Sequence, residues 1–263
     1  MSNKKLIIGA ITGDIIGSIY EKRRVKAKMD FDLFNDNSRF TDDSVLTIAT
    51  MDKLLNNKNY SESYQSYGKK YPKSGFSRTF KEWIFSEKPQ PYKSCGNGSA
   101  MRVSPIGWYS NTIEEAMEEA QKSAEVSHNH IEGIKGAQAV STAIFMARTG
   151  KSKDEIKKFI IDNFKYNLDR KIIDIRPSYK FDVTCQGSVP EAIIAFLESK
   201  DFETALRLAV YIGGDSDTIA CIAGGIAEAY YKKIPANIID FTLGKLPQEF
   251  INVIKYFSIK FRK

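Results

Sequence analysis

The stretch GGDSDTIACIAGGIAEAYY, residues 213–231, decides the fold that the sequence predicts. Beyond its acidic start, it is apolar almost all round and rich in alanine and glycine. Such a helix belongs at the centre of a helical bundle, because small residues let the backbones of neighbouring helices approach closely. We therefore expect a buried central helix to follow the glycine pair at 213–214.

Helical periodicity also dominates the rest of the chain. Residues 111–126 place Ile113, Met117 and alanines on one face with glutamates opposite, and residues 130–150 repeat the pattern up to a terminal glycine. Three further segments show the same helical periodicity: 152–164, 189–199 and 201–214. Strand-like alternation is nearly absent and no hairpin signal is evident. These patterns predict an all-α fold.

No composition shift, repeat or linker divides the 263 residues, so we expect one domain spanning 1–263. The segment from Lys165 to Gln186 is the least regular and is expected to form a long loop or short turns. The net charge of +7 is modest, and the lysines are spread along the chain. A nucleic-acid-binding footprint is therefore not indicated.

The cysteine pattern indicates a reducing compartment. Cys95, Cys185 and Cys221 are odd in number, far apart and without CxxC spacing, which argues against a disulfide framework. The apolar run near the start is interrupted by Asp14, so we do not interpret it as a signal peptide. No run reaches about 18 apolar residues, so no transmembrane helix is expected. We expect a soluble cytoplasmic protein that is a monomer and contacts no membrane.

Two acidic clusters suggest a metal site. Thr41-Asp42-Asp43 and Asp215-Ser216-Asp217-Thr218 each place two carboxylates and a hydroxyl at the head of a predicted helix. Hydroxyl and carboxylate oxygens suit Mg²⁺ or Mn²⁺, and two such clusters together can hold two ions about 3.5–4 Å apart. The alternative is helix capping by the same side chains. Because the clusters match, we favour metal binding.

A third acidic point lies in GDIIGSIYEKRR, residues 13–24. Gly13 and Gly17 share a helix face and permit close packing. Taken alone, Glu21 is interpreted as a solvated glutamate. Asp14 lies inside an apolar run and needs a buried partner or a cap.

The remaining polar motifs are a glycine turn and a histidine pair. In GNGS, Gly96, Asn97, Gly98 and Ser99 can offer backbone N–H groups to a phosphate, although an ordinary loop turn is the alternative. The two histidines, His128 and His130, lie far in sequence from every cysteine, so a structural zinc site is excluded. Any bound metal should be a hard cation held by oxygen.

The chain resembles the ADP-ribosylglycohydrolases through five motifs in one order: GDIIGSIYE (13–21), FTDDS (40–44), GNGSAMR (96–102), SHNHIEGIKGAQA (127–139) and GGDSDTIACIAGGI (213–226). The similarity extends from about Gly9 to Tyr231. It implies a compact orthogonal helical bundle with a binuclear magnesium or manganese centre at the bottom of an ADP-ribose cleft.

Carried over position by position, the resemblance implies a set of site residues. The metal ligands are Thr41, Asp42, Asp43, Asp215, Asp217 and Thr218, of which Asp42 and Asp215 are expected to be essential for catalysis. Glu21 sits beside the metals and participates in catalysis or gates the site. Ligand contacts are implied for Gly96, Asn97, Gly98, Ser99 and His128, and for a second loop of Gly75, Phe76 and Ser77. For His128, a capping or core role is the alternative.

The sequence thus predicts a metal-dependent hydrolase that removes ADP-ribose from a modified acceptor. The acceptor is an ADP-ribosylated protein, with a nucleic acid or a small molecule as alternatives. A non-catalytic ADP-ribose-binding or structural relative is the competing interpretation, and an unrelated metal-dependent phosphohydrolase is a third. Retention of all the candidate metal ligands and Glu21 argues for the enzyme. Residues 22–39 are interpreted as a lid over the scissile bond.

Overall fold

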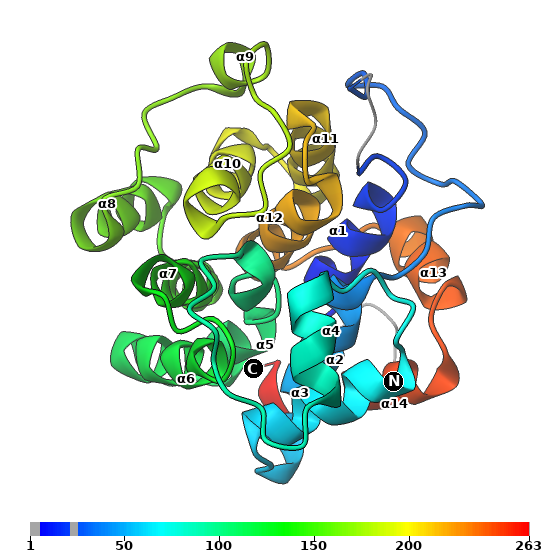
Figure 1. Ribbon diagram of the computed structural model, residues 1–263. Coiled ribbons are helices and arrows are strands. Elements are labelled where there is room, and N and C mark those ends of the chain that lie inside the picture. Colours follow the sequence, from blue (N-terminus) through cyan, green and yellow to red (C-terminus); the bar gives the residue numbers. More distant parts are fainter. Residues whose placement is uncertain (1–5, 22–25, 263) are drawn as a thin grey trace.

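The computed structural model describes residues 6–21 and 26–262, and over these ranges it contains helices and no β-strand (Figure 1). The all-α prediction is confirmed. In chain order the elements are α1 Gly9–Gly17, α2 Asp42–Asn56, α3 Tyr60–Lys70, α4 Arg78–Phe85, the 3₁₀ turn η2 Asn97–Ser99, α5 Ser104–Tyr109, α6 Ile113–Glu125, α7 Ile131–Arg148, α8 Lys153–Phe164, α9 Ile172–Ile175, α10 Cys185–Glu198, α11 Phe202–Ile212, α12 Ser216–Tyr231, α13 Ala236–Gly244 and α14 Gln248–Phe261.

Helix α12 is the central helix that the sequence predicts. All its residues from Ser216 to Ala229 are buried. Helix α1 runs antiparallel to it in direct backbone contact: a Cβ added at Gly13 would lie 1.9 Å from the carbonyl oxygen of Ala220, and one at Gly17 would lie 2.5 Å from that of Ser216. Only glycine permits this approach. The contact places the carboxyl end of α1 beside the amino end of α12.

The opposite end of this helix pair is held by Glu228, near the end of α12. Its Oε2 accepts hydrogen bonds from the backbone N–H groups of Ile8, at 3.0 Å, and Gly9, at 2.7 Å. Its Oε1 accepts from Nη1 of Arg262 at 2.7 Å. Helix α1 has no side-chain cap of its own at Ile8, so Glu228 satisfies N–H groups that would otherwise be unpaired.

The other predicted helices are also present, as α6, α7, α8, α10 and α11. The segment from Lys165 to Gln186 is mostly irregular, as expected, and contains the four-residue helix α9 before α10 begins at Cys185. All three cysteines are free thiols. The buried apolar side chains form one connected cluster, and the single-domain organisation stays a prediction from the sequence. Across the described residues, no helix combines the length and the apolar character that a membrane span requires.

The segment interpreted as a lid is only partly described, since residues 22–25 lie outside the described ranges. Its described part packs on the body of the protein: Phe31 and Leu33 are buried, and Arg207 of α11 donates hydrogen bonds to the carbonyl oxygen of Phe31, at 2.7 Å, and of Met29, at 3.2 Å. Of residues 26–39, Arg39 alone lines the cleft described below. The described part therefore packs against the body of the protein and borders the cleft only through Arg39, while a role as a lid stays a prediction.

Candidate active site

A cleft of about 360 Å³ lies where the amino ends of α2 and α12 meet the carboxyl end of α1. Its walls are completed by the loop at 73–77, the loop before η2, and His128 ahead of α7. The following predicted site residues line it: Glu21, Thr41, Asp42, Asp43, Gly75, Ser77, Gly96, Asn97, Gly98, His128, Asp215, Asp217 and Thr218. Segments nearly 200 residues apart in the sequence are thus brought to one cavity.

Asp14 organises the α2 side of this cleft, and the sequence analysis did not count it among the site residues. It is fully buried on α1. Its Oδ1 accepts a hydrogen bond from the Thr41 hydroxyl at 2.6 Å, and its Oδ2 accepts from the backbone N–H of Thr41 at 2.9 Å and of Ser44 at 3.1 Å. The Ser44 hydroxyl also donates to Oδ2. Asp14 therefore fixes the first turn of α2, which carries Asp42 and Asp43.

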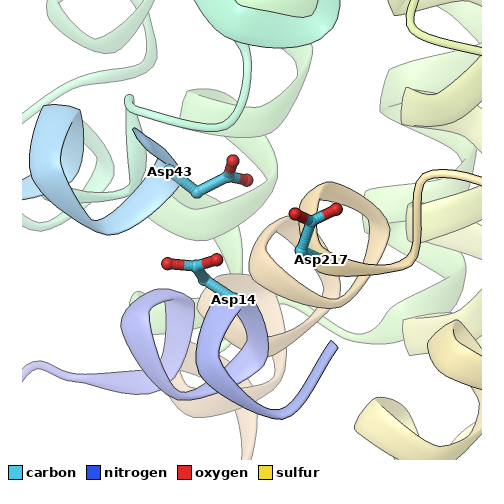
Figure 2. A group of neighbouring side chains, drawn as sticks. All are labelled: Asp14, Asp43 and Asp217. Atoms are coloured by element: carbon cyan, nitrogen blue, oxygen red, sulfur yellow. The ribbon is translucent and has the colours of Figure 1, made fainter. Parts of the chain in front are cut away.

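Three buried carboxylates converge from three helices. Oxygens of Asp14, Asp43 and Asp217 lie within 4.8 Å of one another and face a common space (Figure 2). One of them, Oδ1 of Asp43, is buried and accepts no hydrogen bond from the described residues. A buried carboxylate oxygen without a donor is costly, unless an ion supplies the missing interaction.

A second acidic group adjoins the first and shares Asp217 with it. Oxygens of Glu21, Asp215 and Asp217 also lie within 4.8 Å of one another. Asp215 accepts a hydrogen bond from Nδ2 of Asn97 at 2.6 Å, which ties the loop before η2 to the amino end of α12. The backbone reaches Asp215 through Gly213 and Gly214, with φ angles of 83° and 79° that favour glycine.

Capping does not account for these carboxylates. Thr41 is the N-cap of α2, but its hydroxyl oxygen accepts only a long 3.4 Å hydrogen bond from the N–H of Asp43 while it donates to Asp14. Asp215 occupies the N-cap position of α12, yet within the described residues its side chain makes no capping hydrogen bond. N-cap hydrogen bonds alone therefore do not explain the crowding, although Asp42, Asp43 and Asp217 lie in first helical turns, where the helix dipole favours acidic side chains.

Burial and mutual repulsion disfavour the ionised forms. Burial, with repulsion from Asp14 and Asp215, raises the pKa of Asp42 to about 8. Burial and the neighbouring carboxylates also hold the pKa values of Asp43 and Asp217 well above their usual range. A divalent cation between these oxygens would stabilise the ionised forms. The donors are carboxylates and threonine hydroxyls, the hard oxygen ligands that suit Mg²⁺ or Mn²⁺.

The glycine loops lie against the acidic groups. A Cβ at Gly75, which has a φ of 108°, would lie 2.9 Å from Oδ1 of Asp42. Gly96 and Gly98 line the cleft opposite His128. Two residues of the predicted ligand loops do not line it: Phe76 is buried against Phe80, and the Ser99 hydroxyl donates to the carbonyl oxygen of Gly133 at 2.8 Å.

Comparison with known proteins decides the family. The family model described as ADP-ribosylglycohydrolase matches residues 4–253, which is nearly the whole chain. The chain belongs to the ADP-ribosylglycohydrolase family. The resemblance drawn from the five motifs is confirmed.

Relatives within the ADP-ribosylglycohydrolase family are distant. The chain is 24% identical over 304 residues to mouse ADP-ribosylhydrolase ARH3, covering 86% of this chain and 82% of ARH3. It is 25% identical over 147 residues to ADP-ribosylarginine hydrolase Tri1 of Pseudomonas putida (strain GB-1), covering 52% of this chain and 39% of Tri1. A solved structure titled ADP-ribosylglycohydrolase-related protein complex superposes with a TM-score of 0.74 at 20% identity, over 97% of this chain and 96% of that one, which supports the fold.

Several residues that line the cleft were not predicted. Arg39 and Lys73 are exposed cations at its wall, and Phe181 and Val183 are partly exposed apolar side chains from the irregular segment before α10. The others are Leu46, Ser74, Phe80, Ser94 and Met101. Nothing in the spacing of these residues separates them from ordinary loop and core positions. In this member of the ADP-ribosylglycohydrolase family, they complete the walls of the cleft around the acidic groups.

Proposed function

We propose that the protein is a metal-dependent hydrolase that cleaves the glycosidic bond between ADP-ribose and a modified acceptor. The observation that carries this proposal is the convergence of buried carboxylates from α1, α2 and α12 in the cleft, with Oδ1 of Asp43 lacking a hydrogen-bond donor among the described residues. Membership in the ADP-ribosylglycohydrolase family and similarity to proteins named ADP-ribosylhydrolases support it.

We infer that two divalent cations, Mg²⁺ or Mn²⁺, bind between the heads of α2 and α12. Six residues would hold them: Thr41, Asp42, Asp43, Asp215, Asp217 and Thr218. Asp14 would act behind them by fixing the first turn of α2. When bound, such ions neutralise the crowded carboxylates, orient the ribose hydroxyls and lower the pKa of a bound water.

The side chains of the protein supply positioning and proton transfer. Glu21 lies with Asp215 and Asp217 at the open side of the acidic groups and accepts the proton of the attacking water. The anomeric carbon of ADP-ribose gains the water oxygen as its bond to the acceptor breaks. The acceptor leaves with the proton returned by Glu21, so that free ADP-ribose and the unmodified acceptor are the products. Asn97 holds Asp215 in place throughout.

The test is hydrolysis of a panel of conjugates in which ADP-ribose is joined to arginine, to serine or to a nucleic acid. We expect release of free ADP-ribose from at least one conjugate with Mg²⁺ or Mn²⁺, and none after chelation. Turnover that survives thorough chelation would contradict the metal-dependent mechanism. Tight ADP-ribose binding without turnover of any conjugate would favour the non-catalytic interpretation. A monomeric state and a cytoplasmic location stay predictions from the sequence.

A further inference from the structure

A buried chain of hydrogen bonds leads from Arg102 to the cleft. Nη2 of Arg102 donates to the Ser127 hydroxyl at 3.1 Å, and the Ser127 Oγ lies 2.8 Å from Nδ1 of His128. Arg102 and Ser127 are fully buried, and the His128 side chain is 6% exposed at the cleft. Sequence analysis singled out His128 alone, and the function proposed above uses neither of the other two residues.

The donors and acceptors fix the direction of this chain. A guanidinium only donates, so the Ser127 oxygen accepts from Arg102 and keeps its single proton for another partner. Among the described residues, Nδ1 of His128 is the acceptor that the Ser127 hydroxyl meets. The opposite tautomer, with a proton on Nδ1, would leave the serine proton buried without an acceptor, at a cost of about 1–3 kcal/mol. The imidazole therefore carries its proton on Nε2.

The surroundings keep this ring neutral. Burial and the nearby Arg102 guanidinium hold the pKa of His128 well below its usual range. The ring is flanked by the aromatic rings of Tyr92 and Phe80, with centroids 5.7 and 6.0 Å away. Within the part of the chain that the structure describes, no ion pair links a carboxylate to His128. A second proton on the imidazole is thus disfavoured.

Arg102 is itself held rigidly. Its guanidinium carbon lies 4.2 Å from the centroid of the Tyr64 ring, and Nη2 also donates to the carbonyl oxygen of Ser123. The Tyr64 hydroxyl is in turn 2.7 Å from the Ser123 hydroxyl oxygen. These contacts stabilise the buried cation and hold its Nη2 beside Ser127, while Nη1 has no hydrogen-bond partner among the described residues.

Nε2 of His128 faces a position that two glycines keep open. A Cβ at Gly98 would lie 3.0 Å from Nε2, and a Cβ at Gly96 would lie 3.5 Å from it. Glycine at both positions leaves Nε2 uncovered on the side of the cleft, so a bound ligand can bring an oxygen within hydrogen-bond distance of it. His128, Gly96 and Gly98 all line the cleft.

We propose that Arg102 and Ser127 are positioning residues that lock His128 as the neutral Nε2–H tautomer, so that the ring donates a hydrogen bond to an anionic or hydroxyl oxygen of the ligand beside Gly98. The identity of that ligand as ADP-ribose rests on the proposed function, whereas the tautomer does not. The ring acts as a fixed donor without carrying a charge, and it neither gains nor loses a proton during binding.

The tautomer can be measured directly, because the chain has only two histidines. Long-range ¹H–¹⁵N spectra of ¹⁵N-histidine-labelled protein at pH 7, assigned with a His130→Asn variant, should show a protonated Nε2 and an unprotonated Nδ1 for His128. Asparagine is a good N-cap, so this variant keeps the cap that His130 provides for α7. A protonated Nδ1, an imidazolium or a rapid mixture of tautomers would overturn the proposal.

Substitution of Ser127 tests the positioning role. In Ser127→Ala, His128 should populate both tautomers, affinity for free ADP-ribose should fall about tenfold by calorimetry, and KM for a cleaved conjugate should rise more than kcat falls. Ser127→Thr retains the hydroxyl and should restore the Nε2–H tautomer and the affinity. Ser110→Ala is the matched control, since Ser110 is equally buried and its hydroxyl bonds the Ile106 carbonyl outside the cleft. An unchanged tautomer and affinity in folded Ser127→Ala would refute the inference.

Failure of the proposed function gives a different result. A protein that binds ADP-ribose without hydrolysing any conjugate still shows the tautomer and the affinity change, so the inference survives while the enzyme proposal fails. The wild-type spectrum needs no ligand and no variant. It therefore decides the tautomer even where Ser127→Ala does not fold.

Discussion

The cleft has an acidic end, at Asp14, Asp43 and Asp217, and a histidine end, at His128 and Arg102, and the buried charges at the two ends are of opposite sign. At the acidic end, Asp14, Asp43 and Asp217 crowd together and repel one another, and Oδ1 of Asp43 lacks a donor among the described residues. At the histidine end, Arg102 is buried against Tyr64 and starts a chain of hydrogen bonds that runs through Ser127 to His128, while its Nη1 has no hydrogen-bond partner among the described residues. The acidic end therefore crowds like charges that a bound cation would neutralise, whereas the histidine end holds a single buried cation packed on an aromatic ring. Four experiments test this contrast.

The largest effect is expected from Asp43→Asn. Loss of one carboxylate should lower hydrolysis by roughly 10²–10³-fold, the size of effect seen when one preorganised electrostatic group is removed. Stability without metal should not fall, because a carboxyl group whose ionised form is disfavoured by burial and by its acidic neighbours is replaced by a neutral amide. Turnover and chelator-treated thermal melts measure the two quantities. Asp52→Asn is the control, since Asp52 lies on the same helix but pairs with Lys58 outside the cleft.

Metal addition is the next largest effect. Mg²⁺ or Mn²⁺ at about 100 times its Kd should stabilise the folded protein by about 2.7 kcal/mol. For a chain of this size, that corresponds to a rise in Tm of roughly 5–10 °C. The rise should disappear in Asp43→Asn and persist in Ser127→Ala, because only the acidic end needs the ion. Equal shifts in wild type and Asp43→Asn would remove the distinction between the two ends.

Asp14→Asn should show whether Asp14 stabilises the first turn of α2 in the absence of metal. All four donors around Asp14 come from Thr41 and Ser44, so an amide NH₂ in place of one oxygen would face a donor. We expect a loss of about 2 kcal/mol in the free energy of unfolding, measured in urea without metal. Asp43→Asn should show no such loss. If both variants are equally stable, Asp14 does not hold the first turn of α2.

The smallest effect is a pH dependence from the histidine end. The pKa of His128 is lower in the folded protein than in the unfolded chain. Just below pH 6.5, His128 is therefore protonated in the unfolded chain and still neutral in the folded protein. The contribution of His128 to stability should therefore fall as the pH drops below about 6.5, by at most about 1.4 kcal/mol per pH unit, while the carboxyl groups with raised pKa values contribute with the opposite sign. In urea unfolding between about pH 5 and 7.5, the stability of the wild type relative to His128→Asn should fall as the pH is lowered. His130→Asn, at an exposed N-cap, should keep the wild-type slope.

The fold and the acidic loop residues could be predicted because they depend on local sequence. The apolar stretch after Gly214 predicts a buried helix without any knowledge of the helices that pack on it. Glycines four positions apart, at 13 and 17, predict a close backbone contact with a neighbouring helix. Carboxylates beside threonines at two helix heads also form a pattern visible without coordinates. The structure places all six of these candidate ligands on one cleft, while their role as metal ligands stays a prediction.

The missed features depend on contacts distant in the sequence. Asp14 was noticed as a charge in an apolar run, but its partners, Thr41 and Ser44, lie 27 and 30 residues away. The path of the backbone turns Phe76 and Ser99 away from the cleft, and no residue pattern signals this. Arg39 and Lys73 are two of 39 basic residues, so only the structure distinguishes them.

The glycine contact between α1 and α12 has a consequence for synthesis of the chain on the ribosome. Gly9 and Gly224 touch through their backbones, and they are 215 positions apart in the sequence. Closing so long a loop costs conformational entropy, and this cost precedes any stabilisation of the fold by the contact. The acidic cleft cannot assemble while the nascent chain ends before α12, so the proposed active site stays incomplete until that helix has been synthesised.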